Sequence, residues 1–126
     1  MLGGCSWMSS ILVTRRFCSR RTLQVLAILR RFAHVRLSLH GHVHANSLTA
    51  RAGIAFVSTA SADEYPMQWR EVIVRQCEIE LRMHSLVLPG LLDESARREA
   101  GRGAGRNEAK RGGPMDNNVI LRTCPK

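Results

Sequence analysis

Apolar and polar residues alternate along much of this chain with the period of two that a half-buried β-strand requires. The alternation is strictest at Cys77, Ile79, Leu81 and Met83, whose intervening residues are all charged, so one face of that strand should lie in water. The same pattern, or a run of β-branched and aromatic residues, predicts strands at 35–40, 54–59, 69–75, 77–83 and 119–121.

Two segments have the spacing of helices instead. Apolar residues recur every three or four positions between Leu23 and Phe32, and Thr22 has the position of an N-terminal cap. A second, shorter helix is expected at 91–100. The glycine-rich stretch 101–106 should end it, because glycine has a large conformational-entropy cost in a helix. We expect residues 107–114 to continue as a linker.

These elements predict an α/β chain of the α+β kind. We expect three parts, namely a mobile segment at 1–21, a folded part at 22–92, and a C-terminal helix, linker and tail at 93–126. Within them, the strand-rich residues 35–84 should form a unit of marginal stability, while the Gly/Arg-rich residues 101–118 should be mobile. The hydrophobic content of 44% and charged content of 23% are ordinary for a folded domain.

The net charge of +9 is unevenly distributed, because residues 1–62 contain eight arginines and no Asp or Glu. An arginine-rich, acid-free start is typical of a mitochondrial transit peptide. It also fits a chain start or reading frame that is not the natural one, which we favour, or a surface for nucleic acid. Charge alone gives non-specific, salt-dependent affinity, so a small basic nucleic-acid-binding protein is our alternative hypothesis.

Apolar runs and cysteines bear on the compartment. No apolar run reaches the roughly 18 residues of a transmembrane helix, so we expect no membrane partner and a cytoplasmic protein. The cysteines are far apart and form no Cys-x-x-Cys motif, so neither a zinc knuckle nor a disulfide framework is indicated. We expect reduced thiols at Cys5, Cys18, Cys77 and Cys124.

Three histidines follow the strand predicted at 35–40. His40, His42 and His44 occupy alternate positions, with Gly41 after the first. Side chains two apart on a strand share a face, and neutral imidazole is the commonest metal ligand in proteins. The pattern predicts a metal site, against the simpler explanation of ordinary histidines at a strand end. For His34 and His84, which have no partner at ligand spacing, we prefer the simpler explanation.

The block Gly41-His42-Val43-His44, with the Ala45-Asn46 that follows, resembles the last metal-binding block of the calcineurin-like metallophosphoesterases. The whole run 37–75, including the turn Glu64-Tyr65-Pro66, resembles the strand, histidine loop and returning hairpin of bacterial members of that family. The resemblance implies part of a β-sandwich flanked by helices. It also implies hydrolysis of phosphomonoesters or phosphodiesters by the parent protein.

The family's dinuclear centre assigns roles to individual residues here. By resemblance, His42 and His44 each ligate a different divalent ion (Mn, Fe or Zn). At the position of His40 the family more often has a small residue such as serine. We therefore expect His40 either to be structural or, like Asn46, to lie beside the ligands without binding metal. Two such ions clamp the attacking and leaving oxygens of a phosphoryl transfer and lower the pKa of a bound water.

The chain departs from the family in what it lacks. Members have four further blocks, among them Asp-x-His, Gly-Asp-x-x-Asp and Gly-Asn-His followed by Asp or Glu, none of which occurs here. The aspartates Asp63, Asp93 and Asp116 all follow the histidines. We therefore expect a C-terminal fragment that is inactive alone, with no catalytic residue and no stably bound ions. Its unpaired strand edges also favour self-association.

Overall fold

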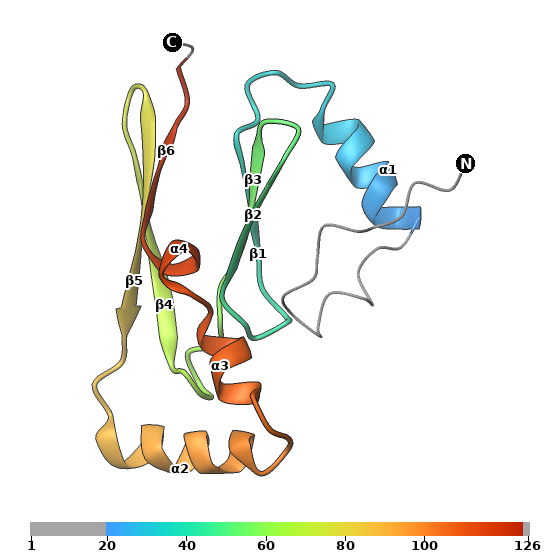
Figure 1. The fold of residues 1–126 in the computed structure, drawn as a ribbon. Helices are drawn as coiled ribbons and strands as arrows, with labels where there is room; N and C mark the ends of the chain where they lie inside the picture. The colour runs from blue at the N-terminus through green and yellow to red at the C-terminus, as the bar shows by residue number, and fades with distance from the viewer. Residues whose placement is uncertain (1–19, 125–126) are drawn as a thin grey trace. The chain divides into compact units, whose positions relative to one another are not determined.

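The computed structural model describes residues 20–124, and the chain divides into two units after Val35 (Figure 1). The described part of the first unit holds helix α1 (Arg20–Leu29) and a turn in which the Val35 N–H donates to the Phe32 carbonyl. The predicted Thr22 cap is wrong, because the helix begins two residues earlier. The mobility expected for 1–21 concerns residues that lie almost entirely outside the described part.

The second unit contains two three-stranded sheets. The first has the order β1-β3-β2, formed by β1 (Leu37–His40), β2 (Ser47–Arg51) and β3 (Ile54–Ser58). β1 runs parallel to β3, whereas β2 and β3 form an antiparallel hairpin. Ala52 and Gly53 join this hairpin with φ of 53° and 77°, as a tight turn with positive φ at both central residues requires.

The second sheet is antiparallel in the order β4-β5-β6, from β4 (Gln68–Val74), β5 (Glu78–Ser85) and β6 (Val119–Arg122). The predicted strands are confirmed here within a residue or two. On β5 the alternation gives the expected result, since Leu81 is fully buried while Arg82 is exposed and pairs with Glu80 on the outer face.

The two sheets share one small core. Its fully buried centre is Val57 from β3 and Leu81 from β5, with Ala55 beside them. Partly buried apolar residues from both sheets surround this centre: Leu37, Leu48, Val72, Ile79, Val119 and Leu121. With helices beside the sheets, the chain is a mixture of α and β, as the sequence pattern predicts.

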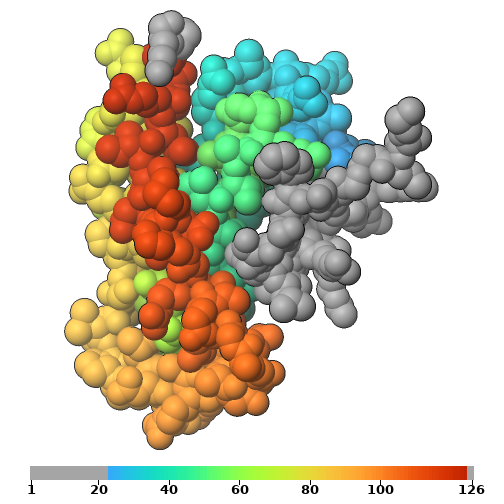
Figure 2. All heavy atoms as spheres, viewed as in Figure 1, coloured from blue at the N-terminus to red at the C-terminus, as the bar shows by residue number. Residues whose placement is uncertain are grey.

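Three helices lie between β5 and β6 in the sequence: α2 (Pro89–Ala100), α3 (Arg106–Arg111) and α4 (Pro114–Asn117). α2 ends where the glycines were expected to end it. The linker predicted at 107–114 is wrong, because α3 and α4 occupy most of this segment. The mobility expected for 101–118 stays a prediction. The sequences of α3 and α4 carry little helical signal, and contacts with α2, β2 and β5 hold these two helices. In Figure 2 the red atoms of the C-terminal part lie beside yellow atoms, in agreement with the pairing of β6 and β5.

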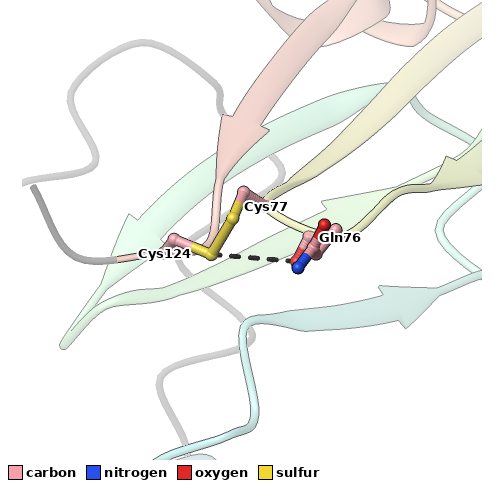
Figure 3. Close-up of a disulfide and its surroundings, with 3 residues drawn as sticks. All are labelled: Gln76, Cys77 and Cys124. Carbon is pink, nitrogen blue, oxygen red and sulfur yellow. Dashed lines mark hydrogen bonds between the residues drawn. A yellow bond between two sulfur atoms is a disulfide. The ribbon is translucent and has the colours of Figure 1, made fainter.

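Cys77 and Cys124 form a disulfide, with their Cα atoms 4.9 Å apart (Figure 3). The expectation of reduced thiols is wrong for this pair. β6 pairs with the edge of β5, and the Thr123 N–H donates to the Cys77 carbonyl at 2.9 Å. These contacts bring Cys77 and Cys124 together, although they are 47 positions apart in sequence. The described helices are all too short or too polar to cross a membrane.

The disulfide should stabilise the fold chiefly by restricting the unfolded chain. A closed loop of this length predicts that the double variant Cys77→Ser/Cys124→Ser loses roughly 2–4 kcal/mol in its free energy of unfolding, measured by urea titration without reductant. The control is the same titration with reductant, which should lower the stability of the parent to that of the double variant, because reduction breaks the Cys77–Cys124 bond. Equal stability of parent and Cys77→Ser/Cys124→Ser would show that the bond does not constrain the chain.

Candidate metal centre

The histidine loop, residues 41–46, joins β1 to β2. The strand ends at His40, so the period-two argument does not reach His42 or His44. Both have positive φ, 70° and 54°, and the Val43 N–H donates back to the Gly41 carbonyl at 2.9 Å. Positive φ is uncommon outside glycine, although histidine adopts it more readily than most residues. A tight loop, and not a strand, aims these imidazoles.

The three histidines do not converge. His40 is exposed, its Nε2 lies 2.9 Å from the Ser38 Oγ, and its ring stacks on Phe56 at 5.9 Å between centroids. His42 is exposed in the loop. Within residues 20–124, no three His, Cys, Asp or Glu side chains come together as a metal site. The convergence expected from strand spacing is therefore wrong, because the chain leaves the strand at Gly41.

His44 has a carboxylate partner. Its Nδ1 lies 2.6 Å from the Oε1 of Glu64, which belongs to the segment between β3 and β4. A carboxylate only accepts hydrogen bonds, so Nδ1 carries the hydrogen, and in the neutral imidazole Nε2 then keeps its lone pair. The His44 side chain remains 45% exposed. This arrangement is common around metal-ligating histidines, whose second nitrogen usually donates to a carboxylate or carbonyl.

Glu64 is itself bound by a lysine of α3. The Nζ of Lys110 donates to Glu64 Oε1 at 2.5 Å and lies 3.2 Å from Glu99 Oε2 on α2. Hydrogen bonding from Lys110, opposed by burial and helped by His44, holds the pKa of Glu64 below its ordinary value of 4.5. The Lys110 side chain is only 9% exposed, so its ammonium group contacts these two carboxylates in place of water.

Glu99 ends the network on the helix side. Its carboxylate is 3% exposed and accepts hydrogen bonds from Arg106 at 2.5 Å and Arg102 at 3.1 Å. Burial raises the pKa of Glu99, but hydrogen bonds from Arg106 and Lys110 outweigh burial and hold that pKa below 4.5. We call the connected side chains the ion-pair network: His44, Glu64, Lys110, Glu99, Arg102 and Arg106.

Asn46, the last residue of the loop, is completely buried. Its side-chain NH₂ donates to Gln68 Oε1 at 2.6 Å and to the Arg111 carbonyl at 3.1 Å, while its Oδ1 accepts from the Ala60 N–H at 2.8 Å. Its backbone N–H donates to the Lys110 carbonyl at 2.8 Å. The amide expected beside the metal ligands is thus fully used in holding the loop against α3 and β4.

Gly112 allows α3 to approach this closely. A Cβ there would lie 2.7 Å from the Asn46 carbonyl oxygen, and the residue has φ of 68°, which disfavours any other side chain. The contacts that α2 and α3 make with the loop have no signal in the sequence. Glu99 and Lys110 carry no motif, and only their positions in the folded unit connect them with the histidines.

A cavity of about 160 Å³ opens beside the network, between α2 and the segment that precedes β4. Its lining includes Asp63, Glu64, Glu94, Arg98, Glu99 and Arg102. None of the three loop histidines lines it, so it lies behind Glu64 rather than at the imidazoles.

The lowered carboxyl pKa values make the network sensitive to acid. A carboxyl whose pKa is lower in the folded chain stabilises the fold fully above its ordinary pKa of 4.5, and the stabilisation is lost as the pH falls through the folded-state pKa. Glu99→Gln should lower the free energy of unfolding at about pH 7 by about 1–3 kcal/mol. It should also weaken the fall in stability below about pH 4.5, measured by urea titration at stepped pH.

The matched control is Glu94→Gln, five residues earlier on α2. Glu94 pairs with Arg97 and Arg98 in solvent, so its loss should change stability much less. If the two variants lost stability equally, the buried position of Glu99 would be irrelevant to the fold.

No match was found for this chain among protein-family models, curated proteins or solved structures. The resemblance to calcineurin-like metallophosphoesterases rests on the residues of the run 37–75, and it stays an interpretation of those residues.

Proposed function

We propose that this chain supplies the histidine loop of a dinuclear, metal-dependent phosphoesterase. In this proposal His42 and His44 each ligate one divalent ion, Mn, Fe or Zn, and the substrate is a phosphomonoester or phosphodiester. The observation that carries the proposal is the contact of His44 Nδ1 with Glu64 at 2.6 Å, which leaves Nε2 as the nitrogen available to an ion.

The donor set of the loop fits ions of this kind only in part. His42 is exposed and His44 is about half exposed, so both imidazoles are accessible. Two imidazoles nevertheless give each ion of a pair a single protein ligand, whereas catalytic zinc sites have three. The remaining ligands must come from another segment or chain, and this chain alone is inactive in our proposal.

The loop is also held more firmly than its length suggests. Asn46 fixes its end through four hydrogen bonds, and Glu64 fixes the ring of His44. Binding groups placed on loops need such a rigid scaffold to keep their geometry. Paired divalent ions, when bound, lower the pKa of a water and neutralise phosphoryl charge. In this proposal the chain presents and orients two metal ligands, His42 and His44.

Hydrolysis is the first test. The purified chain with Mn²⁺ should cleave a chromogenic phosphodiester no faster than Mn²⁺ alone, because the bridging carboxylate and phosphate-binding residues of the family are missing. Turnover above the metal-only rate that disappears in His42→Ala would contradict the need for further ligands.

Metal binding is the second test. Titration with Ni²⁺ or Zn²⁺ in a calorimeter should show weak binding that is lost in acid, because imidazole ligates metal only when neutral. His42→Ala and His44→Ala should each weaken it, whereas His84→Ala, on β5, should not. Tight, stoichiometric binding that survives His44→Ala would place the metal site elsewhere.

A further inference from the structure

We infer that Glu64 is a positioning residue for His44, and that Lys110 and Glu99 of the C-terminal helices hold Glu64 in place. The inference deepens the proposed function, since it matters for metal only if His44 is a ligand. It assigns control of the histidine loop to α2 and α3, which lie far from the loop in sequence.

The first step is the tautomer of His44. A neutral imidazole carries its hydrogen on either Nδ1 or Nε2, and only the unprotonated nitrogen binds metal. Glu64 Oε1 accepts from Nδ1 at 2.6 Å, which fixes the hydrogen there and stops the ring from rotating. No partner for Nε2 is found among the described residues, so that nitrogen remains open to an ion.

The second step is what holds Glu64. The same Oε1 atom that contacts His44 also accepts from Lys110 Nζ, so ring and ammonium meet at one oxygen. Lys110 is buried, and its ammonium cannot turn to water without leaving two carboxylates. Glu99, 3% exposed, holds Lys110 from the other side. In an ion pair at the surface, by contrast, each charged group can leave its partner and be solvated by water.

The third step is the backbone. The carbonyl of Lys110 accepts from the Asn46 N–H, two residues after His44. One residue of α3 therefore fixes the histidine loop through its main chain and Glu64 through its side chain. A shift of α3 would move both supports of His44 together.

A second histidine and carboxylate pair provides the control. His84 Nε2 lies 3.0 Å from Glu71 Oε2 on the second sheet, with similar exposure of both side chains. His84 stacks on Trp69, and neither it nor Glu71 belongs to the ion-pair network. Replacing Glu71 removes a comparable charge without touching the support of His44.

The experiment measures ring ¹⁵N shifts of labelled histidine at about pH 8, where an ordinary imidazole is neutral. Parent protein should show His44 with hydrogen on Nδ1. Glu64→Ala should shift the tautomer towards Nε2–H, and Lys110→Met should do so in part. Glu64→Gln should retain the parent tautomer, since its amide oxygen still accepts, and Glu71→Gln should not change His44.

The Ni²⁺ affinity of the same proteins gives the second readout. Glu64→Ala should lower it by about 10–100-fold, as loss of an outer carboxylate typically does. Glu64→Gln should lower it less, and Glu71→Gln should leave it at the parent value. Amide spectra of each variant check folding, and if Lys110→Met does not fold, the two Glu64 variants still decide the outcome.

The failures are distinguishable. If His44→Ala leaves Ni²⁺ affinity unchanged, the proposed function fails, while the tautomer still tests the positioning role. An unchanged His44 tautomer in folded Glu64→Ala overturns the inference, whatever the metal does. Equal losses of affinity in Glu64→Ala and Glu71→Gln would also overturn it, because they would indicate a general effect of charge.

Discussion

The buried amide of Asn46 is the interaction on which the candidate site depends. Its side chain and backbone connect the histidine loop with Gln68 at the start of β4, with Ala60, and with the end of α3. A buried amide stabilises a fold only when its donors and acceptor are satisfied, and here each has a protein partner. The positions of loop, strand and helix are thereby coupled, so none of them can shift alone.

Charged side chains hold α2 and α3, which the small apolar core does not reach. The fully buried centre between the sheets amounts to Val57 and Leu81 with a few small neighbours, and it lies away from α2 and α3. Those helices dock through the ion-pair network and through Tyr65, which stacks beneath Arg111 and whose N–H donates to Ser95 Oγ. Directional contacts of this kind fix orientation more strictly than apolar packing does.

The sequence predicts every strand except β2 (Ser47–Arg51), and it predicts the site only in part. Alternation marks strands such as β5 because one face is buried and the other wet. Helix α3 escapes detection because it is held by contacts with Asn46, Glu64 and Glu99, which lie outside its six residues. Similarly, the spacing of His42 and His44 identifies chemically interesting residues, but positive φ in the loop gives them a geometry that strand periodicity does not contain.

The bond between Cys77 and Cys124 also changes the topology of the molecule. It turns the chain from β5 to the end of β6 into a covalent ring that contains α2, α3 and α4. A protease that cuts the glycine-rich connection between α2 and α3 would leave both pieces attached, and α3 would stay at high effective concentration near its docking site. If α3 leaves the histidine loop, the covalent ring therefore keeps it close enough to bind again. In a reducing compartment, where disulfides are rare, only the pairing of β6 with β5 would close this ring.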